Sequence, residues 1–483
     1  MRGLIDDQDV RDGGGARWAR AMVGASLLVI ACGDSEGETG ATASDSGTSD
    51  VETSAATSAG TTAGTTGGAS GVTTGDSAGA STSTTSSAAS TDDPGTTSPS
   101  DQTKFDLGAL PDGGDGGCGD GGDDDLVFSN IWISNSPQGT VSKIDTETMV
   151  ELGRYYTDAG QAGDPSRTSV NLQGDVAVVN RAGGITKIAA SEERCVDKNN
   201  NGVIDTSTGP NDLLGYAAEE CILWTTPLPA ASRPAAWTSG EKVGEGCNAQ
   251  YINAKVWTSA PTGADAYVYL LDGDTGEIEG QVLVPGANGG LGIYGGAVDP
   301  VNDFWGVTYS AGPLVHVRFE DLSYETIPLP NPSAYGFTVD SQGRSWVGGW
   351  SGILQRYDPE TQTWTAANMA GYSGLSRGMM EDQSGHLWIA GLSTSALLRV
   401  DTDSATLIEA LDAAVLPGVA TPTGASVDYN GTVWMVDQSK SGGGAFVYEP
   451  ETQEVNWVGG LQGPYTYSDM TGWALGNVAN PQG

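Results

Sequence analysis

Residues 195–221 combine a run of oxygen-bearing side chains with a cysteine at each end, CVDKNNNGVIDTSTGPNDLLGYAAEEC. Within this run, side-chain or main-chain oxygens recur at alternate positions around Gly202, the spacing with which a short loop wraps a hard cation such as calcium. The candidate calcium ligands are Asp197, Asn199, Asn201, the main-chain carbonyl of Val203 and Asp205. A metal-free turn rich in Asp and Asn is the alternative interpretation of the same residues.

This loop differs from an EF-hand at the twelfth position, where an EF-hand needs a bidentate Glu and this chain has Thr208. Pro210 follows closely, and no helical pattern flanks the loop. The loop therefore resembles the calcium loops of thrombospondin-type and cohesin-partner repeats. Three nearby acids are candidates to complete the ligand set: Asp212, Glu219 and Glu220.

The N-terminus has the organisation of an export signal. Arg17 and Arg20 precede the apolar run AMVGASLLVIA, which is too short to span a bilayer as a stable helix. The tetrapeptide VIAC, which ends at Cys32, resembles the bacterial lipobox, in which cleavage before the cysteine leaves its thiol to carry a diacylglyceryl group. We therefore expect residues 1–31 to be a lipoprotein signal peptide. The lipid on Cys32 would then anchor the chain in the outer membrane of a bacterium, on its periplasmic or its outer face. A plain secretory signal is the alternative.

Four cysteines follow Cys32, an even number that favours two disulfides in an oxidising compartment. Cys195 and Cys221 enclose the calcium-like loop, so we expect them to pair and to close a structural insertion at residues 192–224. By elimination, Cys118 pairs with Cys247. The insertion is thus expected to brace the fold rather than to hold the working site.

Two segments before residue 126 cannot form a core. Residues 32–104 are rich in Ser, Thr, Gly and Ala and contain no aromatic residue, which predicts a disordered tether. Residues 105–125 are a Gly/Asp run without Lys or Arg, which predicts a solvated acidic spacer. The formal net charge of −40 argues against nucleic acid as a partner, because phosphate binding needs a basic surface.

A repeat organises residues 126–483. Each copy has a turn with glycine or asparagine and then a tryptophan in a short apolar strand, as at Trp305, Trp346, Trp388 and Trp434. An acidic turn follows later in each copy, which gives a unit of four antiparallel strands. Repeats of about 40 to 50 residues built in this way indicate an all-β fold, a β-propeller. We count seven blades, with six and eight as alternatives, and expect residues 467–478 to add a closing strand to the first blade. The tryptophans are expected to pack between neighbouring sheets.

Three copies carry a family resemblance: AYGFTVDSQGRSWVGG (334–349), SRGMMEDQSGHLWIAG (376–391) and PTGASVDYNGTVWMVD (422–437). They resemble the virginiamycin B lyase (streptogramin lyase) family of seven-bladed propellers and, more loosely, NHL repeats. The resemblance implies a His before the strand glycine and a Glu three residues after the Trp, which serve a metal-assisted elimination. This chain has other residues at the His position, namely Tyr294, Tyr335, Arg377 and Thr423. At the Glu position it has Thr308, Gly349, Gly391 and Asp437.

The chain as a whole, with its lipobox, Ser/Thr-rich linker and calcium-like insertion, is also similar to lipoproteins of Gram-negative bacteria. Because the repeated His and Glu are missing, we favour a non-enzymatic propeller that binds a protein, a glycan or a small molecule. The alternative is a metal-dependent lyase or hydrolase that acts in the central funnel. His316 and His386, the two histidines of the chain, are expected to be structural.

The residues expected to cluster in that funnel lie at the ends of the inner strands. They are Asn180, Arg181, Arg233, Tyr294, Tyr335, Trp350, Arg377 and Asp437. Aromatic rings beside arginines suit an anionic or sugar-like ligand. A water-filled funnel without a dedicated ligand is the alternative.

Overall fold

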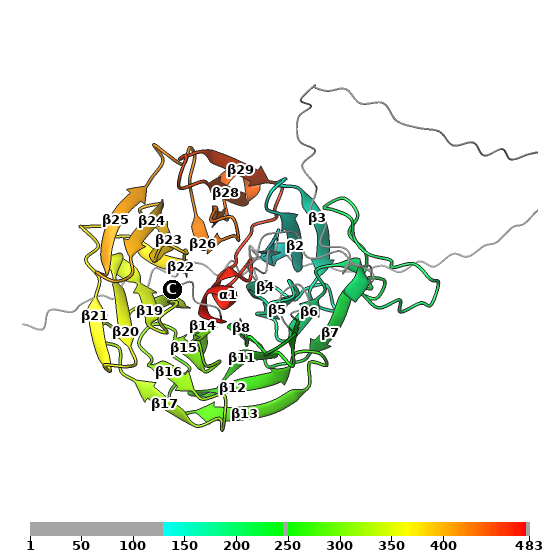
Figure 1. Cartoon of the computed structure of the whole chain (residues 1–483), viewed down its shortest axis with the longest axis horizontal. Coiled ribbons are helices and arrows are strands. Elements are labelled where there is room, and N and C mark those ends of the chain that lie inside the picture. Colours follow the sequence, from blue (N-terminus) through cyan, green and yellow to red (C-terminus); the bar gives the residue numbers. More distant parts are fainter. Residues whose placement is uncertain (1–128, 245–249, 480–483) are drawn as a thin grey trace, which may run out of the picture. The chain divides into compact units, whose positions relative to one another are not determined.

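The computed structural model describes residues 129–244 and 250–479 of the chain. These residues form seven antiparallel sheets that follow one another around a ring (Figure 1). The expected all-β, seven-bladed propeller is therefore confirmed. Several expectations concern residues outside the described part of the chain. They are the signal peptide (1–31), the tether (32–104), the acidic spacer (105–125), the lipid on Cys32 and the Cys118–Cys247 disulfide. The α-helix of the described part is too short to cross a membrane.

In most blades, the strand that comes first in the chain lies innermost and the later ones follow outward. Blade 1 contains β1 (Asn130–Asn135), β2 (Thr140–Asp145) and β3 (Glu151–Tyr156); blade 2 contains β4 (Pro165–Val170), β5 (Val176–Asn180), β6 (Ile185–Ile188) and β7 (Ile222–Thr226). Blade 3 contains β8 (Ala235–Trp237), β11 (Lys255–Thr262), β12 (Asp265–Asp272) and β13 (Ile278–Val284), with a hairpin of β9 (Glu241–Val243) and β10 (Gln250–Ile252) inserted after β8.

The last four blades follow without a large insertion. Blade 4 contains β14 (Ile293–Val298), β15 (Phe304–Thr308), β16 (Leu314–Val317) and β17 (Tyr324–Ile327); blade 5 contains β18 (Ala334–Val339), β19 (Ser345–Gly349), β20 (Leu354–Asp358) and β21 (Thr363–Ala366). Blade 6 contains β22 (Leu375–Glu381), β23 (His386–Leu392), β24 (Ala396–Asp401) and β25 (Thr406–Leu411); blade 7 contains β26 (Pro422–Val427), β27 (Val433–Asp437), β28 (Gly444–Tyr448) and β29 (Val455–Gly459).

The end of the chain closes the ring on blade 1. The backbone N–H of Tyr465 donates to the carbonyl of Ser134 at 3.1 Å, and the N–H of Trp132 donates to the carbonyl of Met470 at 2.9 Å. The segment therefore lies along β1, the first strand of a blade that has only three named strands of its own. This pairing supplies hydrogen bonds to the inner edge of β1, which would otherwise be open.

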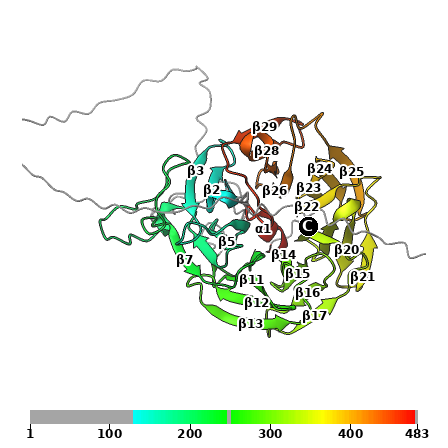
Figure 2. The ribbon, with the colours of Figure 1, turned by 180° about the vertical axis from the view of Figure 1, so that it is seen from behind.

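The prediction of a closing strand at residues 467–478 is wrong for its second half, from Trp473 onward. Residues Trp473–Ala479 form a helix, α1, which Figures 1 and 2 both place at the centre of the ring. The carboxylate of Asp469 accepts hydrogen bonds from the backbone N–H groups of Gly472 and Leu475, at 2.7 and 3.1 Å, and so satisfies free donors at the start of the helix. Strand pairing thus ends at Met470, where this cap begins.

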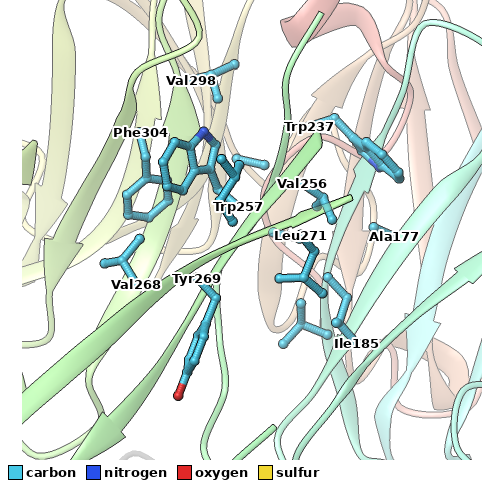
Figure 3. Packing of buried hydrophobic residues seen from close by; sticks show 14 of the residues in the cluster. Ala177, Ile185, Trp237, Val256, Trp257, Val268, Tyr269, Leu271, Val298 and Phe304 are labelled. Carbon is cyan, nitrogen blue, oxygen red and sulfur yellow. The ribbon is translucent and has the colours of Figure 1, made fainter. Parts of the chain in front are cut away.

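The tryptophans fill the space between the sheets, as expected. Figure 3 shows Trp257 of β11 beside Phe304 of blade 4, and the two ring centroids are 5.8 Å apart. Seven tryptophans are fully buried: Trp132, Trp237, Trp257, Trp305, Trp346, Trp388 and Trp434. Burying one large ring between each pair of neighbouring sheets removes apolar surface from water and fixes the spacing of the blades.

An aspartate six residues before the Trp anchors the ring in four blades. In blade 5, Asp340 accepts a hydrogen bond from Trp346 Nε1 at 2.8 Å and, through its other oxygen, from the backbone N–H of Arg344 at 2.9 Å. The same Asp–Trp hydrogen bond occurs in the pairs Asp299–Trp305, Asp382–Trp388 and Asp428–Trp434. One carboxylate therefore fixes both the turn and the indole.

Candidate functional site

Bulges in the inner strands place equivalent side chains of several blades at one end of the channel. The strand register shifts around Tyr294 in β14, around Tyr335 in β18 and around Arg377 in β22. A bulge of this kind re-aims a side chain relative to the regular pleat. The glycine that follows each of them allows close approach of the next blade, since a β carbon on Gly336 would lie 2.0 Å from the carbonyl oxygen of Arg377.

Four tyrosine hydroxyls meet at this end of the channel. The hydroxyl oxygen of Tyr465 lies 2.6 Å from that of Tyr335 and 2.9 Å from those of Tyr294 and Tyr467. The Tyr335 hydroxyl oxygen also lies 3.0 Å from that of Tyr294 and 3.1 Å from that of Tyr467. All four side chains are buried. The inner strands of two blades and the closing segment thus share one hydrogen-bonded group of phenols.

Guanidinium groups surround these rings. The Arg167 guanidinium lies between two of them, 4.7 Å from the centroid of Tyr294 and 4.1 Å from that of Tyr467. Arg377 lies 5.6 Å from the ring of Tyr335 and 5.8 Å from that of Tyr465. Both arginines are buried, so these cation–π contacts act where water screens them little.

Two further arginines and two partly exposed aromatic residues complete the group. Arg233 lies over Tyr294 at 5.2 Å and Arg181 over Tyr465 at 5.1 Å. The ring centroids of Tyr294 and Tyr309 are 5.1 Å apart, and those of Tyr335 and Trp350 are 6.1 Å apart. We call the whole group the channel cluster: Arg167, Arg181, Arg233, Tyr294, Tyr309, Tyr335, Trp350, Arg377, Tyr465 and Tyr467. Its half-buried members, Arg181, Tyr309 and Trp350, form its rim.

Two residues expected in the funnel have their contacts elsewhere. Asp437 is fully buried, and its carboxylate accepts hydrogen bonds from backbone N–H groups of the adjacent loops, including Ala420 at 2.7 Å and Lys440 at 2.9 Å. Asn180 donates to the carbonyl of Thr157 and accepts from the hydroxyl of the same residue, both at 2.7 Å. Both side chains brace loops at the ends of second strands. The other six expected residues belong to the channel cluster.

The sequence reading missed Arg167, Tyr309, Tyr465 and Tyr467. Arg167 lies in blade 2, where Ala177 stands at the position of the repeat Trp. Tyr465 and Tyr467 are two residues apart in YTYSD, the spacing that places side chains on one face of an extended segment. That alternation was the available signal, but the closing strand was expected to begin at residue 467.

The charges of the cluster affect its tyrosines unequally. Burial raises the pKa of Tyr335 and of Tyr467 well above the usual value for a phenol. Burial also raises the pKa of Tyr465, but the guanidinium charges of Arg167 and Arg377 and the hydrogen bonds from neighbouring phenols outweigh it, so its pKa is lowered. Compared with Tyr335 and Tyr467, Tyr465 has the environment that better stabilises the ionised form.

The opposite end of the channel is closed by α1. A cavity of about 30 Å³, roughly the size of one water molecule, lies between α1 and inner-strand residues such as Gly296, Phe337 and Met379. Glu381 connects α1 to blade 6, because its carboxylate accepts from Asn477 at 3.1 Å and its carbonyl accepts from Trp473 Nε1 at 2.9 Å. We therefore place the candidate ligand site at the cluster end.

The calcium-like loop connects β6 to β7 and is closed by the Cys195–Cys221 disulfide, as expected. The side-chain amides of Asn199 and Asn201 both donate to Asp205 Oδ2, at 2.7 and 3.1 Å, so three of the candidate ligands already meet at one point. A rotation of each amide group by about 180° around its Cβ–Cγ bond would exchange the amide nitrogen and oxygen and so present the oxygen to a cation. The donor set therefore fits calcium.

The acids considered for a further ligand are engaged in other contacts. Glu220 accepts hydrogen bonds from the backbone N–H groups of Lys198 and Asp205, each at 2.8 Å. Glu219 accepts from the backbone N–H groups of Ser207 and Cys221, each at 3.0 Å. These buried carboxylates hold the two sides of the insertion together. Asp212 accepts from the hydroxyl of Thr208 at 2.8 Å.

Both histidines lie in strands away from the cluster. His316 of β16 stacks on Trp305 with a centroid distance of 4.0 Å, and its Nε2 is 2.9 Å from Asp303. Burial lowers the pKa of His316, but hydrogen bonds with Asp303 and Glu325 outweigh it and raise the pKa overall. His386 of β23 contacts Arg399 of the next strand at 2.9 Å. These contacts join neighbouring strands and loops, in keeping with structural roles.

Comparisons with known proteins concern the fold. No family model matches the chain, and no curated protein matches it. Among solved structures, it is similar to a streptogramin B lyase, with 14% identity over 64% of this chain and 86% of the other, at a TM-score of 0.45. It is also similar to virginiamycin B lyase from Staphylococcus aureus, with 12% identity, 65% and 92% coverage and a TM-score of 0.46. For AztD from Citrobacter koseri the identity is 12%, the coverage 70% and 96%, and the TM-score 0.44. The seven sheets establish the propeller independently of these likenesses.

Proposed function

We propose that this protein is a ligand-binding propeller of the bacterial envelope and that the channel cluster binds an anionic ligand. One observation carries the proposal: a chain with 61 acidic and 21 basic residues gathers four arginines and six aromatic rings at one end of its channel. Buried positive charge is costly to maintain, and an acidic protein has no general need for it there.

The residue types suit a carboxylate or phosphate group on a small molecule or a glycan. A guanidinium offers several N–H donors in one plane, which matches both of these anions. In the cluster, the Arg377 guanidinium donates a hydrogen bond to the carbonyl of Pro422 at 2.9 Å, and its Nε is buried without a hydrogen-bond partner in the described part of the chain. The partly exposed rings of Tyr309 and Trp350 offer faces on which a sugar or another flat group would stack.

The remaining parts of the proposal concern position and stability. Lipidation of Cys32 would hold the protein at the outer membrane, and residues 32–104 would serve as its tether. Calcium, held by Asp197, Asn199, Asn201, Val203 and Asp205, would stabilise the insertion in blade 2. No nucleic acid is proposed as a partner.

A lyase in the same funnel is the second function to test. Its geometry is not favoured, because the two histidines of the chain lie in other strands and Asp437 is held by backbone amides. None of these three residues can therefore reach a substrate at the cluster without a rearrangement. A general base must lie within hydrogen-bond distance of the proton that it removes.

A capture experiment tests this proposal. The full chain, with Cys32→Ala to avoid lipidation, is incubated with envelope extract and analysed for bound small molecules, and streptogramin B turnover is assayed in parallel. We expect capture that is lost in Arg377→Ala and Trp350→Ala and retained in Arg318→Ala, which removes an exposed arginine from the turn after β16. Turnover that is lost in Asp437→Asn would contradict the binding function.

A further inference from the structure

Two arginines of the channel cluster, Arg167 and Arg377, are buried and have no carboxylate partner among the described residues. Arg167 donates hydrogen bonds to the carbonyl oxygens of Ser166 at 2.8 Å and of Tyr294 at 3.2 Å. In the described part of the chain, neither Arg167 nor Arg377 forms an ion pair. Asp164, which is partly exposed, pairs with Arg181 at the rim of the cluster.

Buried cations require a counter-charge, because isolated charges are strongly disfavoured away from water. The groups that face the two arginines from the neighbouring elements are phenols: Tyr294 of β14, Tyr335 of β18, and Tyr465 and Tyr467 of the closing segment. Only an ionised phenol could supply negative charge from within this set.

Tyr465 is the phenol whose surroundings suit an oxyanion. Three other hydroxyls lie within 2.9 Å of its oxygen, so all three can donate to it. Its contact with Tyr335, at 2.6 Å, has the length of a hydrogen bond from a hydroxyl to a charged oxygen. Tyr335 also contacts three hydroxyls, but its other two distances are longer, at 3.0 and 3.1 Å.

We propose that Tyr465 is ionised at neutral pH and that its phenolate is the internal counter-charge of Arg167 and Arg377. Three phenol donors and the guanidinium groups replace the water that would solvate this oxyanion. The lowered pKa of Tyr465 described above agrees with this assignment.

The phenolate also determines which ligands the cluster accepts. This consequence rests on the proposed function, whereas the ionisation itself does not. When a ligand carboxylate or phosphate pairs with the arginines, it takes over their charge compensation, and the phenolate then takes up one proton from solvent to become a neutral hydroxyl. Anion binding is therefore coupled to the uptake of one proton and weakens as the pH rises.

Ultraviolet absorbance tests the ionisation directly. At pH 7 the folded full chain should show the absorbance of one tyrosinate, and this should disappear on unfolding in urea, because unfolded phenols titrate near pH 10. Tyr465→Phe should abolish the signal, and Tyr372→Phe, which alters a tyrosine bonded to Thr394 outside the cluster, should keep it. Tyr335→Phe removes the shortest donor and should raise the midpoint of the signal by about one to two pH units.

Absence of any tyrosinate signal below pH 9 in the folded chain would overturn the inference. If Tyr465→Phe fails to fold, the carbon-13 resonances of ring-labelled tyrosines in the unaltered chain decide the matter, since one of them should lie at the phenolate position at pH 7. Calorimetry of anion binding in buffers of different ionisation enthalpy then measures the proton uptake. A signal without anion binding would refute the proposed function alone, and Arg377-dependent binding without the signal would refute this inference alone.

Discussion

The hydroxyl oxygens of Tyr335 and Tyr465 lie 2.6 Å apart, although 130 residues separate them in the chain. Tyr335 is on the inner strand of blade 5, and Tyr465 is in the segment that pairs with β1 and closes the ring. Closing the propeller and assembling the candidate ligand site are therefore the same structural event. Neither can be complete while the end of the chain is undocked.

The repeated Asp–Trp hydrogen bond should contribute measurably to stability. Asp340→Ala removes the acceptor of Trp346 Nε1 and of the turn amide at Arg344, and leaves buried donors unpaired. We expect the free energy of unfolding to fall by about 2 to 4 kcal/mol, measured by urea denaturation. Glu451→Ala, at an exposed acidic turn, is the control and should change it by less than about 0.5 kcal/mol. Equal effects of the two variants would show that the motif is not a structural anchor.

Calcium should stabilise the folded chain through the loop between β6 and β7. Thermal melts in calcium and in chelator should differ, and at a calcium concentration of about 100 times Kd the difference is worth about 2.7 kcal/mol. Asp197→Ala should remove the difference. Asp274→Ala, which alters an exposed carboxylate in another turn, should preserve it. Melts that coincide with and without calcium would leave the loop as a metal-free turn.

The docking of α1 should depend on pH through Glu381. Burial, assisted by the nearby charge of Asp340, raises the pKa of Glu381 to about 7, although hydrogen bonds from Ser341 and Thr402 oppose the shift. An acid with a raised pKa in the folded state binds its proton more tightly there, so its contribution is present below pH about 4.5 and is lost as the pH rises through about 7.

We therefore expect Glu381→Gln to stabilise the chain relative to the unaltered protein at pH 8 but not at pH 5, by at most about 3 kcal/mol. Urea denaturation at the two pH values measures this difference. Glu409→Gln, on the outer strand β25, is the matched control and should leave the pH dependence unchanged. A Glu381→Gln chain that keeps the full pH dependence would exclude this role for Glu381.

The propeller was predictable because its signals are local and recur. Glycine turns, alternating apolar residues and a Trp in most units repeat along the chain, and most blades satisfy their own strand hydrogen bonds. The helix α1 was not predictable in this way. It follows the last blade, where an opening strand was expected, and what ends the strand pairing is a local cap in which Asp469 accepts from N–H groups three and six residues later.

The site was predictable only where the repeat is regular. Tyr294, Tyr335 and Arg377 occupy one register position, so aligning the blades brings them together. Arg167 precedes a weaker copy in which Ala177 replaces the repeat Trp, and Tyr465 lies in the closing segment, so the alignment of the regular blades did not bring either to the site. Asp437 occupies a strand end like Trp350, but its short side chain is satisfied by neighbouring amides and so does not extend into the cluster.

The central claim is that the channel cluster recognises an anionic group. The most direct measurement is calorimetric titration of the full chain with sugars in matched pairs that differ only in a carboxylate or a phosphate. We predict binding of the charged member alone, a loss of at least about tenfold in affinity in Arg377→Ala, and no change in Arg318→Ala. Equal binding of the charged and neutral members, or binding that Arg377→Ala leaves intact, would contradict the account.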